Sequence, residues 1–305
     1  AASIGSVGTI IGTPPNALLV AYMKNEFNIE IGFFDWMLVG VPLSVVMLAA
    51  CWFLLTYVLF RPEIGEIPSG KKIIQDELDK LGPITIPEKL VGIIFVAAAT
   101  CWISLGFILK SFDVKIASLD AIIAMSTAIL LFIVPANKSG ERLIDWDSAK
   151  KLPWDILILF GGGLSLSAQF SSSGLSLWIG HQVSALGALP IAAIIMAVVA
   201  LVIFLTEITS NTATAAAFLP VIAGVSAGLG YTGANVMIFT IPVAMAATFA
   251  FMLPVATPPN AIAYGSGYVK ISSMIKAGIW LNITGTFLIT AAVVFIASAV
   301  FGLKI

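Results

Sequence analysis

One short polar motif occurs twice in this otherwise apolar chain. The sequence Thr-Pro-Pro-Asn-Ala is found at residues 13–17 and again at 257–261, each time inside an apolar stretch long enough to enter a membrane. A proline has no N–H to donate and its ring clashes with the preceding turn, so two in succession predict an unwound helix. The carbonyls freed by the breaks, at Gly12 and Ala256, are costly to leave bare in lipid. A cation such as Na⁺ would satisfy them.

The half-helix that begins after each break favours the opposite charge. Its first N–H groups and the positive end of its dipole suit a carboxylate. Thr13 and Asn16 in the first copy, and Thr257 and Asn260 in the second, add hydroxyl and amide groups at equivalent positions. Together the two motifs predict neighbouring cation and carboxylate sites.

A third polar cluster, Thr-Glu-Ile-Thr-Ser-Asn-Thr, lies within a long apolar region. Thr206 and Ser210 are four residues apart, which predicts a shared helix face. Ser210, Asn211 and Thr212 supply oxygens for a cation and donors for an anion. Glu207 is the one acid in this cluster, and two roles are open for it: a proton or cation group, or a carboxyl that ties the hairpin backbone together.

Composition identifies the class of protein. The chain of 305 residues is 59% hydrophobic and 10% charged, with a mean hydropathy of +1.06, whereas a soluble domain has about 25% charged residues. This predicts an all-α polytopic membrane protein. Two arginines and no basic stripe argue against nucleic-acid binding. No membrane segment has a His, Asp, Glu or Cys cluster with catalytic or metal spacing, so an enzyme is the least supported reading and no cofactor is expected.

Apolar segments of about 20 residues predict membrane helices. Region 185–228 is too long for one crossing and polar at its centre, which predicts a re-entrant hairpin buried in protein. Lysine and arginine set the orientation: four of the 15 lie in segments assigned to the outside (Lys24, Lys110, Lys115 and Lys304) and the other eleven inside. The C-terminus is then outside, and the two Pro-Pro helices cross in opposite directions. An inverted repeat of broken helices is typical of secondary transporters.

These residues resemble the divalent anion/sodium symporter family, the sodium-coupled di- and tricarboxylate transporters. Ser210-Asn211-Thr212 matches the Ser-Asn-Thr motif of the family's second hairpin tip. Residues 12–16 and 256–260 match its two Pro-Pro breaks. The family also has a first Ser-Asn-Thr motif, which is not in this sequence and is expected upstream of Ala1. The chain is therefore expected to be the C-terminal two-thirds of a longer protein.

The resemblance implies an elevator mechanism, a homodimer and the following domains. These are a first broken helix of the transport domain (1–32), a further transport-domain helix (33–60), a cytoplasmic amphipathic linker (61–89), scaffold and dimerisation helices (90–176), and the rest of the transport domain (177–305), which contains the hairpin (185–228), the second broken helix (235–264) and a C-terminal helix (276–301). It also implies sodium binding by Gly12, Thr206, Ser210, Asn211 and Ala256. Substrate binding is implied for Thr13, Asn211, Thr212, Thr257 and Pro258, with Asn16 and Asn260 as further candidates.

The sequence thus predicts sodium-coupled symport of dicarboxylates such as succinate, and sparse loops favour a bacterial inner membrane. Sodium-independent exchange, or transport of citrate or sulfate, is the alternative within the carriers. An anion channel or receptor is a more remote alternative.

Overall fold

The computed structural model describes residues 1–61, 70–112, 116, 118–137, 140–152, 154–183 and 189–304. Over these ranges the chain is built from helices, and the one β pairing is an isolated bridge between Pro135 and Arg142. The chain divides into two compact units, the larger of residues 1–31, 35–59 and 155–305 and the smaller of residues 32–34 and 60–154. The prediction of an all-α membrane protein is confirmed at this level.

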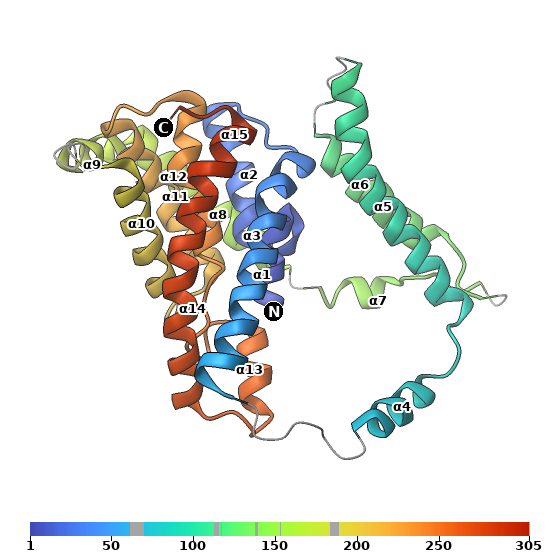
Figure 1. The fold of residues 1–305 in the computed structure, drawn as a ribbon. Coiled ribbons are helices and arrows are strands. Elements are labelled where there is room, and N and C mark those ends of the chain that lie inside the picture. Colours follow the sequence, from blue (N-terminus) through green and yellow to red (C-terminus); the bar gives the residue numbers. More distant parts are fainter. Residues whose placement is uncertain are drawn as a thin grey trace. The chain divides into compact units, whose positions relative to one another are not determined.

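The larger unit contains all three polar motifs (Figure 1). Its first part comprises α1 (Ala2–Gly5), η1 (Ser6–Gly8), η2 (Ile10–Gly12), α2 (Pro14–Phe27), α3 (Phe33–Phe53) and the π-helical η3 (Leu54–Leu59). Its second part comprises α8 (Asp155–Ser172), α9 (Leu175–Val183), α10 (Ile191–Thr206), α11 (Asn211–Gly228), η5 (Gly233–Val236), α12 (Met237–Ala246), α13 (Pro258–Gly265), α14 (Ile271–Ala291), the π-helical η6 (Ala292–Ala297) and α15 (Ser298–Phe301).

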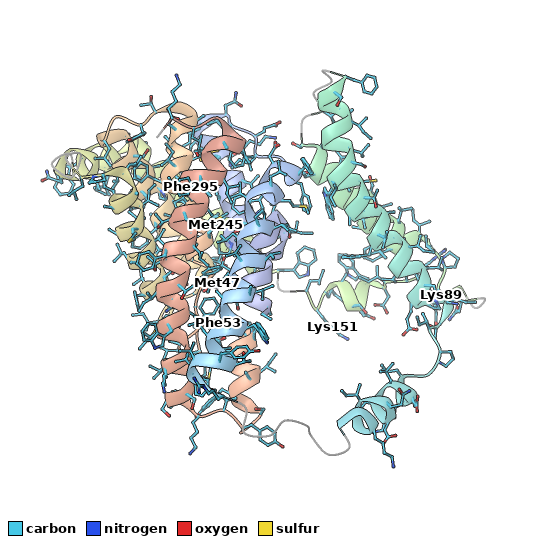
Figure 2. All side chains as sticks on the ribbon, viewed as in Figure 1. Met47, Phe53, Lys89, Lys151, Met245 and Phe295 are labelled. Atoms are coloured by element: carbon cyan, nitrogen blue, oxygen red, sulfur yellow. The ribbon has the colours of Figure 1, made fainter. Side chains whose placement is uncertain are left out.

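Helix α12 forms the core of the larger unit. All ten of its residues are buried, and it packs against α2, α10, α11 and α14. A helix that is apolar on every side is stable only when other elements surround it. Met245 of this helix is fully buried, whereas Phe53 and Phe295 are exposed on the outer surface of the unit (Figure 2).

The smaller unit consists of α4 (Gly70–Leu81), α5 (Ile86–Ser111), α6 (Leu119–Ile133) and α7 (Trp146–Ala149). Helices α5 and α6 pack along each other, and the Trp102 indole donates to the Asp120 carbonyl at 3.2 Å. Many of their large apolar side chains are exposed, Ile93, Phe95 and Met125 among them. Such surfaces suit contact with lipid.

Among the described residues, four helices are long and apolar enough to cross a membrane. They are Phe33–Leu59, Ile86–Gly106, Asn211–Gly228 and Ile271–Phe301. The C-terminal helix begins at Ile271, five residues before the expected start at 276. The expected linker at 61–89 includes residues 62–69, and the expected hairpin begins at 185–188; both stretches lie outside the described residues.

One helix groups differently from the sequence expectation. The sequence places residues 90–176 together, but α8 belongs to the larger unit, where it packs against α2, α9 and α11. Small residues allow this approach: a Cβ at Gly163 would lie 2.7 Å from the Ala216 Cβ. Gly180 of α9 and Gly228 of α11 meet in the same way. Close helix contacts of this kind are typical of membrane proteins.

Candidate functional site

Both Pro-Pro motifs begin a helix instead of interrupting one. Pro14 and Pro258 are the first residues of α2 and α13, and the unwound backbone lies ahead of them. The preceding Thr13 and Thr257 are extended, with φ of −151° and −144°. Proline is favoured at the first helical position because that N–H has no acceptor in the helix. The break itself is therefore correctly predicted, but it precedes the prolines.

The two unwound segments are held by the same side chain in the same way. The Asn16 amide donates to the Thr9 carbonyl at 2.9 Å and to the Ser6 carbonyl at 3.5 Å. The Asn260 amide donates to the Leu253 and Ala250 carbonyls, both at 3.0 Å. In each copy the acceptors lie seven and ten residues before the asparagine. Asn16 and Asn260 thus shape the loops.

The carbonyls of Gly12 and Ala256 are excluded from the helices that follow them. The residue three positions after each is a proline, which has no N–H. The residue four positions after each has its N–H directed elsewhere: Asn16 N donates to the Thr13 carbonyl, and Asn260 N to the Thr257 hydroxyl. Neither carbonyl is therefore hydrogen-bonded within the helix that follows it.

The hairpin tip connects two helices. Helix α10 ends at Thr206 and α11 begins at Asn211 with Ser210 as its N-cap. The expectation that Thr206 and Ser210 share a helix face is wrong, because the chain leaves the helix between them. The fully buried Thr206 hydroxyl lies 2.7 Å from Asn211 Oδ1 and 2.9 Å from the Ala247 carbonyl. It therefore joins the tip to the second break.

A cavity of about 680 Å³ lies where these elements meet. Its lining is rich in hydroxyl, amide and carbonyl groups and, among the described residues, includes no charged side chain. The lining residues predicted from the sequence are Gly12, Thr13, Ser210, Asn211, Thr212, Ala256, Thr257 and Pro258. Thr206, Asn16 and Asn260 are not part of the lining and support it from behind.

Two threonines of the lining are not among the predicted site residues. The Thr248 hydroxyl donates to the Thr13 hydroxyl at 3.5 Å and so brings the two breaks together. The Thr209 hydroxyl lies 2.6 Å from the Thr214 hydroxyl within the hairpin. No local pattern singles out Thr248. Thr209 belongs to the polar cluster of the hairpin tip and directly precedes Ser210, so its position in the sequence could have indicated it.

Three helices begin at this cavity, but they do not present the same groups. Helix α11 offers its first N–H groups, and no side chain caps them. Helices α2 and α13 have prolines in their first two positions, which carry no N–H. The expectation of bare N–H groups after both Pro-Pro breaks is therefore wrong. Helix N–H groups therefore face the cavity mainly at the start of α11, and carbonyls excluded from helix bonding lie at the two breaks.

Comparison with known proteins identifies the family of this chain. The chain matches the family described as "Sodium:sulfate symporter transmembrane region" over residues 1–302. It is 43% identical, over its whole length, to the "Sodium-dependent dicarboxylate transporter SdcS" of Staphylococcus aureus strain USA300 and equally to that of strain MRSA252. The chain spans 58% of the length of these relatives. The names are those of transporters. The chain is a multi-pass membrane protein that belongs to the sodium:sulfate symporter transmembrane-region family.

Proposed function

We propose that this chain is part of a secondary transporter that carries dicarboxylates such as succinate together with sodium ions. The observation that carries the proposal is the uncharged cavity that joins the hairpin tip to both breaks. It offers oxygens and helix N–H groups side by side. Relatives at 43% identity named sodium-dependent dicarboxylate transporters support the same assignment.

The cations are assigned to the two breaks. One sodium site uses the Gly12 carbonyl. The other uses Thr206, Ser210, Asn211 and the Ala256 carbonyl. Support comes from the carbonyls that the prolines exclude from the helix and from the contact between Thr206 and Asn211. A hard cation prefers such oxygen ligands.

The carboxylate is assigned to the start of α11. Asn211 and Thr212 would receive it, with Thr13, Thr257 and Pro258 completing the wall of the cavity. The described lining has no cationic side chain, and in this proposal the helix dipole and the bound sodium ions balance the negative charge. This dependence of the anion on the cations gives a physical basis for coupling.

The family resemblance extends the proposal to an inverted repeat, an elevator movement and a homodimer. The matched loop geometry of the two breaks supports the repeat. Helices α2 and α13 extend toward opposite ends of the larger unit (Figure 1), as opposite crossing directions require. In this proposal residues 1–60 and 177–305 form the moving domain and the C-terminus faces outward across a bacterial inner membrane. Helix α8, expected among the scaffold helices, is assigned to the moving domain because it packs there.

Uptake of labelled succinate by the full-length protein in liposomes tests the proposal. We expect uptake driven by an inward sodium gradient and little uptake when potassium replaces sodium. Equal rates in the two salts would overturn the coupling. Because the family description includes sulfate, sulfate and citrate are added as competitors; stronger inhibition by either than by unlabelled succinate would favour the alternative substrate.

A further inference from the structure

Glu207, at the hairpin tip, holds the second unwound segment by its backbone. The side chain is 3% exposed, and its Oε1 accepts from the N–H groups of Phe251 at 2.6 Å and Met252 at 2.9 Å. Its Oε2 accepts from Met252 at 3.0 Å and Leu253 at 3.2 Å. All four of these bonds reach residues 251–253, so the carboxylate connects the hairpin tip to the segment that leads to Ala256.

Asn282 of α14 adds one more donor to this carboxylate. Its Nδ2 donates to Glu207 Oε1 at 2.8 Å, and the residue has no exposed surface. Its Oδ1 is also buried and has no hydrogen-bond partner among the described residues. An unsatisfied buried amide oxygen destabilises a fold. The bond donated to Glu207 and the unpaired oxygen therefore have opposite effects on stability, whereas a leucine of similar size would have neither.

The contacts continue from Glu207 to the sodium ligands. Leu253, whose N–H Glu207 binds, uses its carbonyl to accept from Ala256 N at 3.2 Å and from the Asn260 amide at 3.0 Å. On the other side, Glu207 follows Thr206 directly in the chain. This one carboxylate is thus connected to the Ala256 residue through Leu253 on one side and to Thr206 along the chain on the other.

We propose that Asn282 is a positioning residue for the second sodium site. It fixes the Glu207 carboxylate in the orientation that places the Ala256 carbonyl opposite Thr206, Ser210 and Asn211. The inference rests on the proposed sodium coupling. Asn282 itself binds neither sodium nor substrate.

Asn282→Leu tests this role in the full-length protein. Thr290→Val is the matched control, because Thr290 lies two turns further along α14, is 5% exposed and bonds to the backbone of its own helix. We expect Asn282→Leu to raise the sodium concentration for half-maximal succinate uptake about tenfold, the order expected for a lost hydrogen bond to a charged group. The succinate KM at saturating sodium should stay within about twofold of the wild-type value, which is the residual effect expected between sites that do not interact directly.

A second readout does not depend on transport. Sodium that binds the folded protein raises its apparent Tm with concentration. We expect the Tm of Asn282→Leu without sodium to lie within a few degrees of the wild-type value, because the lost bond to Glu207 and the removed unpaired oxygen have opposite effects. The variant should need about tenfold more sodium than wild type for the same rise in Tm. Asn282→Asp keeps the size but places a second acid against Glu207, so it should weaken sodium binding further and provides the test if the leucine variant does not accumulate.

The outcomes separate this inference from the proposed function. A wild type without sodium dependence in either readout overturns both. A sodium-dependent wild type with unchanged half-saturation in Asn282→Leu or Asn282→Asp overturns the positioning role alone. An equal shift in Thr290→Val does the same, because it would show that any loss of a buried hydroxyl or amide on α14 has this effect.

Discussion

Replacing Gly12 by alanine tests the assignment of the first break as a cation site. A Cβ on Gly12 would lie 2.1 Å from the Ser6 carbonyl oxygen and 2.8 Å from the Ser6 carbonyl carbon. Ordinary contact begins at 3.4 Å, so the two backbone segments must separate by 1.3 Å (3.4 − 2.1). Because the clash is with backbone, no side-chain rotation relieves it. Overpacking of this kind costs roughly 1–3 kcal/mol.

The effect on the proposed sodium site should be larger than the effect on stability. Ligand distances in a metal site are held to within about 0.2 Å, and the required displacement is several times that. The moving atoms include the Gly12 carbonyl, the proposed ligand. We therefore expect Gly12→Ala to lose sodium-dependent succinate uptake while its Tm falls by a few degrees, roughly 2–4 °C per kcal/mol for a domain of this size.

Gly5→Ala is the matched control in the same segment. Gly5 ends α1 with a helical φ of −64°, and an added Cβ would meet no atom of the described residues within 4 Å. This variant should transport as wild type does and gain up to about 1 kcal/mol of stability, since alanine is preferred to glycine in a helix. The reasoning is refuted if Gly12→Ala retains the wild-type rate and sodium half-saturation in liposomes.

Three further predictions concern single side chains. Thr206→Val, which removes the hydroxyl between Ala247 O and Asn211 Oδ1, should cost roughly 1–3 kcal/mol and raise the sodium half-saturation of uptake; an unchanged half-saturation would remove Thr206 from the site. Asn16→Leu and Asn260→Leu should each lower stability by roughly 2 kcal/mol or more, because each leaves two carbonyls of an unwound segment without their donor; thermal unfolding that finds one variant neutral would contradict the equivalence of the breaks. Thr212→Val should raise the succinate KM at saturating sodium more than the sodium half-saturation, and the reverse order would move Thr212 to a cation site.

Local signals explain what the sequence predicts correctly. Proline pairs and a Ser-Asn-Thr cluster inside apolar segments are rare enough to mark the breaks and the tip without any knowledge of packing. The available carbonyls of Gly12 and Ala256 follow from the prolines alone. The position of the breaks could also have been inferred, since proline is favoured at the first turn of a helix and disfavoured in its interior.

Long-range packing explains what the sequence does not predict. Asn282 is 75 residues from its partner Glu207, and a single asparagine in an apolar helix gives no indication of what it faces. Thr248 is 235 residues from Thr13. The roles of these residues depend on which helices pack against each other. A single sequence does not indicate which helices become neighbours.

The two breaks have the same hydrogen-bond pattern around their asparagines, but they differ in what satisfies their other backbone polar groups. Residues ahead of the first break wind into two 3₁₀ turns, Ser6–Gly8 and Ile10–Gly12. Trp36 of the adjacent α3 adds a bond to the Val7 carbonyl at 2.9 Å. The second break instead has a longer stretch without helix, from 247 to 257, whose amides at 251–253 depend on Glu207. The same motif is thus supported by local winding in one copy and by a distant carboxylate in the other.

This difference predicts a selective response to Glu207→Gln. The amide side chain has only one acceptor oxygen where the carboxylate has two. The N–H groups of residues 251–253 and the Asn282 amide must then share that one oxygen. Hydrogen exchange of the purified protein should accelerate at residues 251–253 and stay at wild-type rates in Ser6–Gly12, because the 3₁₀ turns do not use Glu207. Equal acceleration in both segments would show that the two breaks open as one cooperative unit, and the local winding of the first would then contribute little to holding it.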